Sequence, residues 1–544
     1  MLATVGNPVP DTPHAVSVSL PSWKAVVGYE EGQEWVVSKM KTGYPRFFIH
    51  LTIQELEKEI LRRYGRHGEA IMLFPSHGTA KRCEQFFYDK IEGLPTGIVH
   101  VLHFEPTINR SRATKHEVAL SQLHCVLFPK TYFSTAKQVW QHSGDGISSR
   151  RGEFCLGLLR DGLLQPVAER PNSRQDGIFT KGPRRYQRGG SQSNMVHSIP
   201  GPSKLSHNDQ TNGMEEDKDF SQFIEERFGR NLNAELAAKA KVAIRRRISG
   251  CLEDNSELDQ ALESAPASSD SRLKGLTEEQ VYLYPCGMSS IFNTHRILLA
   301  NTQQRGQEPL KSICFGFPYI DTLKILQKWG PGCLFYGDGS AQDIDDLERR
   351  LEAGERYLAL FTEFPSNPLL NSPDLLRLRA LADKYNFAIV VDETVGNFIN
   401  ISVLSLADVV VSSLTKVFSG DSNVMGGSCI LNPESKWYAE IKETLNVEYE
   451  DNYWAEDAVF MERNSRDFIS RIDRTNTNAE AIVSALQESP LIKQVYYPSV
   501  RPESKKNYDA CRNQTGGYGG LLSVTFKHPE QAVAFFDTLE VEKG

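Results

Sequence analysis

Several features of common protein classes are missing from this sequence. Its nine cysteines are odd in number and scattered along 544 residues, and no two of them form a CxxC pair. This spacing argues against a disulfide scaffold or a zinc ribbon and favours a reducing compartment. No apolar run approaches the roughly 18 residues that a membrane-spanning helix needs, and the start, MLATVGNPVPDTP, has neither the basic nor the apolar region of a secretory signal. The sequence therefore predicts a soluble cytoplasmic protein.

A strong charge of either sign is missing as well. Lys plus Arg number 61 and Asp plus Glu number 69, so the formal net charge is −8. Such a balance gives no reason to expect a nucleic-acid or membrane partner. Hydrophobic residues make up 40% and charged residues 24%, as in an ordinary globular chain. The length allows about two to four domains of roughly 150 residues each.

Composition divides the chain into four stretches. More than half of residues 171–212 are Gly, Pro, Ser, Asn or Gln, and a stretch so poor in apolar residues cannot offset its ordering entropy by burial. We interpret it as a flexible linker, with a regulatory basic patch as the alternative. Residues 1–170 then form an N-terminal extension of unknown role and 213–455 a large domain. Residues 456–544 would be the start of a small C-terminal domain that is incomplete.

The N-terminal extension has the pattern of a folded α/β domain. Residues 51–65 have helical periodicity, and short apolar runs predict buried strands at 69–76, 97–104 and 123–129. We find no catalytic constellation there and interpret the isolated His77 as a structural residue. IMLFPSHGTA (71–80) echoes VYLYPCGMSS (281–290), but chance explains this as well as a partial duplication does. No site is therefore assigned to the extension.

Strand and helix patterns alternate after the linker. A helical stripe runs through 232–248, with Gly250 as a C-cap, and helix-like stretches such as 372–386 follow. The apolar segments of this region are 281–285, 311–317, 332–337, 356–364, 387–393, 407–413 and 427–431. They are unbroken rather than alternating, which suits strands covered on both faces. We predict an α/β layer fold with a mostly parallel sheet covered by helices on both faces. A long helix at 466–489 and two later apolar segments predict a second, smaller α/β domain.

Polar or glycine-containing clusters follow several of these strands, at the edge where open α/β sheets bind their ligands. In PCGMSS (285–290), Gly287 lies in a tight turn that leads into a helix. Such a turn offers free backbone N–H groups to a phosphate, although many turns need glycine for geometry alone. Tyr319 could stack on a planar ligand or belong to the rim of the core. Asn367 lies in a loop that two prolines stiffen, which a simple prolyl turn would also explain.

Two charged residues follow the next strands. Asp392 ends a fully apolar strand, and a carboxylate buried there would need a cationic partner, for which a protonated ring nitrogen would serve. Lys416 follows VVVSS, flanked by Ser413 and Thr415. A lysine desolvated at a strand end would have a depressed pKa, as a Schiff-base nucleophile requires, and a surface lysine is the plain alternative. Each of these clusters is weak evidence for a binding site when taken alone. The interpretation therefore depends on their order within 287–416.

This order resembles the fold-type I enzymes that use pyridoxal 5′-phosphate (PLP), and specifically the cysteine/methionine-metabolism family of trans-sulfuration enzymes. The resemblance extends from about residue 219 to the end. It rests on GM at 287–288, PSNP at 365–368, DET at 392–394 and SLTK at 413–416, with VYYPSV and GGYGGLLSV further on. Within the family, the long extension and the segments YPCGMSS, FPYIDT and TEFPSNPLL are most similar to fungal cystathionine γ-synthases.

The resemblance implies a role for each residue of these motifs. Lys416 would be bonded to the cofactor and act as a base, and Asp392 would keep the pyridinium nitrogen protonated so that the ring is an electron sink. Tyr319 would stack on the ring, and Asn367 would contact its phenolic oxygen. The phosphate would be bound by Gly287, Met288, Ser413 and Thr415, and no metal is implied.

The resemblance also implies an oligomer, in which a Tyr-x-Arg stretch reaches the phosphate from the neighbouring subunit. The matching stretch here is Phe228-Gly229-Arg230, so the arginine is kept and the hydroxyl is absent. The helix dipole disfavours an arginine at a helix start, which favours an anion outside the helix as the partner of Arg230. We expect a homodimer that pairs into a homotetramer.

The activity that the resemblance implies is a γ-replacement. It forms L-cystathionine from an O-acyl-L-homoserine and L-cysteine, a step of trans-sulfuration in methionine biosynthesis. A cystathionine lyase or an O-acetylhomoserine sulfhydrylase of the same family, and a non-catalytic regulatory protein of this fold, are the alternatives. The chain ends at FFDTLEVEKG, before the family's serine-glycine stretch and substrate-carboxylate arginine. We expect a truncated sequence rather than a variant without this clamp.

Overall fold

The computed structural model describes residues 4–45, 47–107, 122–167, 234–250, 252, 258 and 271–543. The linker expected at 171–212 lies outside these ranges. Contacts divide the chain into one unit of Met1–Pro166 with Leu232–Gly544 and another of Val167–Asn231. The N-terminal extension and the large domain therefore belong to the same unit. In the described ranges, none of the helices combines the length and the apolar character that crossing a bilayer requires.

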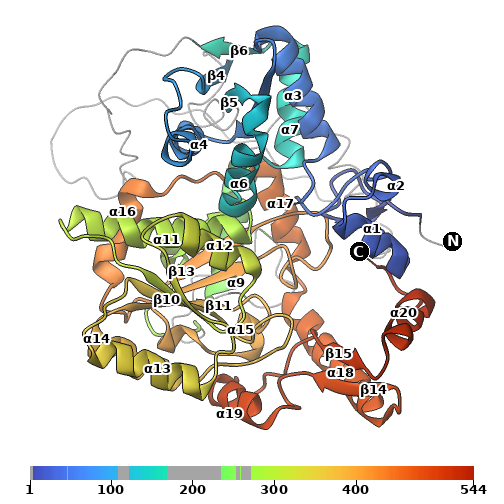
Figure 1. The fold of residues 1–544 in the computed structure, drawn as a ribbon, viewed down its shortest axis with the longest axis vertical. Helices are drawn as coiled ribbons and strands as arrows, with labels where there is room; N and C mark the ends of the chain where they lie inside the picture. Colours follow the sequence, from blue (N-terminus) through green and yellow to red (C-terminus); the bar gives the residue numbers. More distant parts are fainter. Residues whose placement is uncertain are drawn as a thin grey trace, which may run out of the picture. The chain divides into compact units, whose positions relative to one another are not determined.

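A seven-stranded sheet forms the centre of the large domain (Figure 1). In spatial order its strands are β7 (Val281–Tyr284), β13 (Gly427–Leu431), β12 (Val409–Ser413), β11 (Ala388–Asp392), β10 (Ala359–Glu363), β8 (Ser312–Phe315) and β9 (Cys333–Tyr336). Strands β8 to β12 pair in parallel, and β13 is antiparallel to both of its neighbours. The predicted mostly parallel sheet is confirmed, and each of the seven apolar segments contains one strand.

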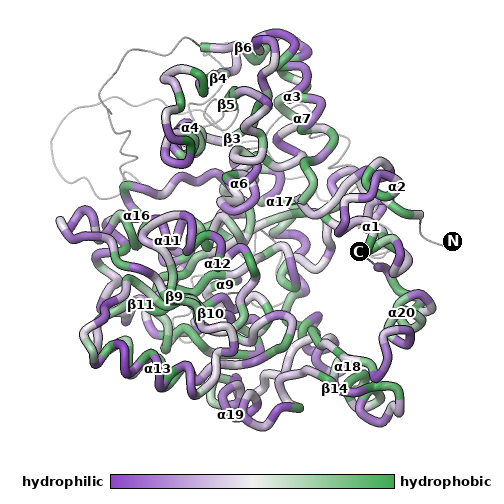
Figure 2. Tube along the Cα trace, viewed as in Figure 1, coloured by the Kyte–Doolittle hydropathy of each residue, from purple (hydrophilic) through white to green (hydrophobic). Residues whose placement is uncertain are grey.

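Helices cover both faces of this sheet, and a separate apolar core lies on each face. Helices α13 (Ala341–Glu352), α14 (Leu375–Tyr385) and α9 (Ala234–Ser249) pack on one face. Helices α11 (Gly287–Gln304), α12 (Ile320–Lys328) and α16 (Tyr438–Glu448) pack on the other. Neighbouring residues of a strand point to opposite faces, so Val391 belongs to the first core and Val390 to the second. This double burial explains the unbroken apolar strands, which Figure 2 shows as hydrophobic next to the more hydrophilic α13.

The N-terminal domain has its own sheet and its own two cores. Its strands, in spatial order, are β3 (Glu69–Phe74), β5 (Leu123–Pro129), β4 (His100–Pro106) and β6 (Leu164–Val167). Helices α3 (Leu51–Tyr64) and α7 (Ser149–Arg160) pack on one face. Helices α4 (His77–Lys90) and α6 (Phe133–Ser143) pack on the other. The predicted helix and the three predicted strands are confirmed, and β5 is antiparallel to β3 and β4.

Short elements precede the N-terminal domain, and a smaller group of elements follows the large sheet. The first are β1 (Pro8–Val9), β2 (Ser17–Val18), α1 (Trp23–Glu30) and α2 (Glu34–Val37). The later ones are α17 (Ala455–Asn464), α18 (Phe468–Glu488), β14 (Ile492–Tyr496), α19 (Pro502–Cys511), β15 (Ser523–Phe526) and α20 (Pro529–Thr538), while the short α15 (Asn397–Asn400) lies between β11 and β12. The long helix predicted at 466–489 is α18. The two late apolar segments, 494–500 and 520–526, overlap β14 and contain β15, which pair antiparallel.

Candidate active site

A cavity of about 340 Å³ lies where β10, β11 and β12 end and α11 begins. This is the carboxyl edge of the parallel strands, where ligands bind in open α/β sheets. Seven of the residues singled out by the motifs line it: Gly287, Met288, Tyr319, Asn367, Asp392, Ser413 and Lys416. The structure thus brings together residues that are up to 129 positions apart (416 − 287 = 129).

The first turn of α11 and the end of β12 form an anion-binding corner of the cavity. The N-cap residue of α11, Cys286, makes no side-chain capping hydrogen bond. A Cβ atom on Gly287 would lie 2.6 Å from the Cβ of Ser413, so only glycine lets helix and strand approach this closely. The Ser413 Oγ is buried and has no hydrogen-bond partner in the described part of the chain. A spare hydroxyl beside an uncapped helix N-terminus fits a phosphate.

Two carboxyl groups lie side by side at the ends of β10 and β11. Glu363 and Asp392 are register partners in the parallel pair. Burial, followed by the charge of Asp392, raises the pKa of Glu363 well above its usual value. Burial also raises the pKa of Asp392, to about 6, against hydrogen bonds from Thr394 that lower it. At neutral pH Asp392 is therefore mostly charged and able to balance a cation in the cavity.

Glu363 is a cavity residue that the motif analysis overlooked. Its carboxyl group accepts hydrogen bonds from the backbone N–H groups of Tyr319 and Asn367, the latter at 3.2 Å. It therefore holds in place the two loops that carry the expected stacking and oxygen-binding side chains. The signal that could have found it, an acidic residue ending an apolar strand, is the one that identified Asp392.

Lys416 lies just past β12 and its side chain is exposed to the cavity. Of the two alternatives for Lys416, the structure favours the exposed lysine over the desolvated one, because the residue has passed the end of the buried strand. Its Nζ lies 4.2 Å from the ring centroid of Tyr44, within the range of a cation–π contact. The ammonium group thus faces the open space in which a ligand would bind.

Tyr44 belongs to the N-terminal extension, to which no site had been assigned. Its segment is anchored beside the cavity, since the Val16 N–H donates to the Ser422 carbonyl at 2.8 Å and the Thr42 hydroxyl to the Ala15 carbonyl at 2.6 Å. The extension therefore contributes one wall of the cavity. A contact over such a sequence separation has no local signature, so sequence periodicity could not reveal it.

Of the remaining expected phosphate-binding residues, Thr415 does not line the cavity and Arg230 lies outside the described ranges. The Thr415 hydroxyl accepts a hydrogen bond from the Gly426 N–H at 3.2 Å and lies 3.3 Å from the Gly426 carbonyl oxygen. It is not among the cavity-lining residues and instead holds the loop before β13. The stretch Phe228-Gly229-Arg230 lies outside the described residues.

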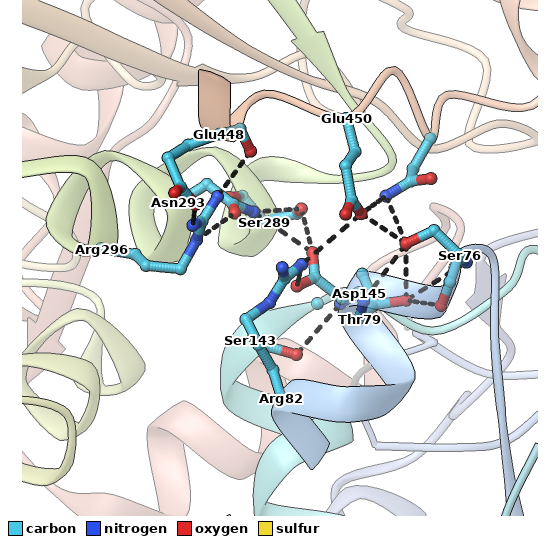
Figure 3. A network of polar contacts seen from close by, with 12 residues as sticks. Ser76, Thr79, Arg82, Ser143, Asp145, Ser289, Asn293, Arg296, Glu448 and Glu450 are labelled. Carbon is cyan, nitrogen blue, oxygen red and sulfur yellow. Dashed lines mark hydrogen bonds and ion pairs between the residues drawn. The ribbon is translucent and has the colours of Figure 1, made fainter. Parts of the chain in front are cut away.

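A polar network joins the N-terminal domain to the first turns of α11 (Figure 3). The buried Asp145 carboxylate accepts hydrogen bonds from Ser289 Oγ at 2.6 Å and from Asn293 Nδ2 at 3.3 Å. The Arg82 guanidinium lies 3.5 Å from its other oxygen. Gly144, with a φ of 65°, leaves no room for a side chain, since its Cβ would lie 2.8 Å from the Ser289 nitrogen. The N-terminal domain thus contacts the helix turn that forms the anion-binding corner.

Known proteins match both parts of the chain. Residues 271–543 match the family described as Cys/Met metabolism PLP-dependent enzyme, and 52–148 match the N-terminal domain of fungal trans-sulfuration enzymes. The cystathionine γ-synthase of Neurospora crassa is 49% identical over 99% of this chain and 89% of its own. The cystathionine γ-synthase-like enzyme iboG2 of Amanita muscaria is 40% identical over 99% and 87%. The solved cystathionine γ-synthase of Xanthomonas oryzae pv. oryzae aligns with 56% of this chain and 81% of its own, at 20% identity and a TM-score of 0.41.

Proposed function

Because the chain belongs to the Cys/Met metabolism family of PLP-dependent enzymes, we propose that it forms L-cystathionine from an O-acyl-L-homoserine and L-cysteine. In this γ-replacement the bond from Cγ to the acyl oxygen breaks and a bond from Cγ to the cysteine sulfur forms. The acyl group leaves as its carboxylic acid and takes up the thiol proton. The observation that carries the proposal is the 49% identity, over nearly the whole chain, to the cystathionine γ-synthase of Neurospora crassa.

The residues of the cavity suit PLP, the cofactor of this family. The orphan hydroxyl of Ser413 and the α11 N-terminus at Gly287 and Met288 would bind its phosphate. Asp392 would place its negative charge beside the ring nitrogen, and Tyr319 and Asn367 would contact the ring and its phenolic oxygen. When bound, PLP supplies an electron sink for the negative charge that develops at the substrate Cα.

The chain's own contribution to the chemistry is a positioned base. Lys416 would hold the cofactor and then remove the proton from the substrate Cα with its ε-amine, because that amine faces the cavity. Tyr44 would cover the amine on one side, since its ring lies 4.2 Å from Nζ. Glu363 would keep Tyr319 and Asn367 in position through its two backbone hydrogen bonds.

Product analysis tests the proposed reaction. The full chain loaded with PLP should convert O-acetyl- or O-succinyl-L-homoserine plus L-cysteine to L-cystathionine, detected by mass spectrometry. Cystathionine alone and homoserine ester plus sulfide serve as parallel substrates. Faster consumption of cystathionine alone would identify a lyase, and faster use of sulfide would identify a sulfhydrylase. No turnover of any of the three would favour a non-catalytic protein.

We also propose that the N-terminal extension, residues 1–170, supports the phosphate-binding turn. Replacing Asp145 with alanine should weaken PLP binding by about five- to thirtyfold, because the Ser289 hydroxyl and the Asn293 amide would lose a buried acceptor worth about 1–2 kcal/mol. The measurement is the PLP dissociation constant, with circular dichroism as a check of the fold. Asp161, at the exposed C-cap of α7, is the matched control. Equal PLP affinity in both variants would contradict the support role.

We also make a proposal for the assembly of the protein and for its location. We propose a homodimer, paired into a homotetramer, in which Arg230 contacts the phosphate in the neighbouring subunit. The similarity of the stretch at 228–230 to the family's Tyr-x-Arg supports this. We propose a cytoplasmic location, which is supported by eight described cysteines that are all free.

A further inference from the structure

Three histidines of the N-terminal domain converge at one end of its sheet. His103 in β4 and His124 in β5 are directly opposite each other in the antiparallel register. His77 is the first residue of α4, which packs on the face of the sheet that carries Val101 and Val126. These valines are two positions from His103 and His124, so both histidines lie on that same face. One nitrogen atom from each of the three rings lies within 4.8 Å of the other two. His77 is therefore not isolated, and isolation was the reason for interpreting it as a structural residue.

The ring positions are close to those of a metal site with three histidine ligands. Ring centroids are 4.7 Å apart for His77 and His103, 5.0 Å for His103 and His124, and 6.1 Å for His77 and His124. The Nδ1 atoms of His103 and His124 are 2.7 Å apart. Zinc–nitrogen bonds of about 2.0–2.1 Å in a tetrahedral arrangement put neighbouring nitrogens about 3.4 Å apart. Ring movements of roughly 1 Å therefore suffice to form this geometry.

The cluster has one buried end and one open side. His124 is buried, His103 half-buried and His77 exposed, so the cluster opens to solvent at His77. A ligand can enter from that side.

In the described ranges, the charge of Arg151 acts on the buried end of the cluster. Its guanidinium donates to the backbone carbonyls of Pro75 at 2.8 Å and Gln122 at 2.7 Å. A hydrogen bond between His103 and His124 would explain why those two rings lie close together. It would not explain why His77 lies beside them.

We propose that His77, His103 and His124 bind a divalent transition metal of the zinc class, with a fourth position open to water or another ligand. The site is in the N-terminal domain, and none of its residues lines the proposed active-site cavity. It is therefore independent of the proposed function. One link from the cluster to the rest of the chain is Ser76, the N-cap of α4, whose hydroxyl donates to Glu450 (Figure 3). Metal binding would thus stabilise the start of α4 and this contact.

Cobalt titration of the tag-free full chain, stripped with a chelator, tests the site. Wild type should bind one Co²⁺ per chain with the visible absorption of a four-coordinate site, and Zn²⁺ should displace it. His77→Ala should weaken binding at least about tenfold, a loss expected for removing a ligand, and it should fold normally because His77 is exposed. His67→Ala, also exposed and outside the cluster, is the matched control and should bind as wild type does.

Thermal unfolding with Zn²⁺ tests the site without relying on the visible absorption of Co²⁺. Zn²⁺ should raise the unfolding temperature of wild type and of His67→Ala, because a ligand that binds only the folded state stabilises it, and it should not raise that of His77→Ala. Absence of Co²⁺ binding by wild type would overturn the proposal. So would equal affinity in wild type and His77→Ala, since the metal would then be bound elsewhere.

Discussion

Lys416→Ala should lower kcat/KM for cystathionine formation by at least about 10³-fold while leaving the fold intact. Lys416 is the only lysine, arginine or histidine that lines the cavity in the described ranges, so no other amine or imidazole there can replace it as the base. The side chain is exposed and lies past the end of β12, and its removal should therefore cost little stability. Steady-state kinetics and thermal unfolding of the PLP-loaded protein measure the two effects.

A control variant and a mixed-dimer experiment test the role of Lys416 further. Lys311→Ala removes an exposed lysine just before β8, outside the cavity, and should keep full activity. Mixing Lys416→Ala with Arg230→Ala should restore part of the activity if each site spans a dimer interface, because one site of a mixed dimer would then be intact. Turnover by Lys416→Ala alone would contradict the base assignment, and a fully active monomer would contradict the shared site.

The hydropathy of the chain predicted most of the large domain. Seven apolar segments each contain a strand, because a parallel sheet buried on both faces needs apolar residues at every position. The same pattern does not encode strand direction. GSCIL at 427–431 looks like its neighbours, yet β13 runs antiparallel to them. Direction is set by the length and path of the connection, which composition does not record.

The residues of the candidate site that lie at strand ends could be predicted from the sequence. Gly287, Asp392 and Ser413 follow apolar runs, and strand ends of a parallel sheet meet at one edge. Tyr44 and Asp145 could not be found in this way, since their contacts with Lys416 and Ser289 span hundreds of residues or a domain boundary. The sequence also carries no sign that the Thr415 hydroxyl turns to Gly426.

Asp392→Asn should lower the activity of the enzyme without lowering the stability of the fold. Activity should fall by about 10²- to 10³-fold, because a neutral amide cannot balance a cationic ring nitrogen as the carboxylate would. The cofactor-free variant should nevertheless unfold at the same or a higher temperature than wild type at pH 7.5, since it no longer has to ionise a carboxyl group beside Glu363. Asp473→Asn, on the exposed side of α18, is the matched control and should change neither quantity.

The sign of the pH dependence follows from the raised pKa of Asp392. The carboxyl group has an ordinary pKa of 3.8 when unfolded and a pKa of about 6 when folded, so its stabilising contribution is complete below about pH 4 and is lost as the pH rises through 6. Two pKa units correspond to at most about 3 kcal/mol. In the cofactor-free protein, the unfolding temperature of Asp392→Asn minus that of wild type should therefore increase between pH 5 and pH 7. Bound PLP should reduce this gain, because the ring cation favours the carboxylate. A gain that does not change with pH, or an asparagine variant that retains full activity, would show that Asp392 is not the counter-charge of the cofactor.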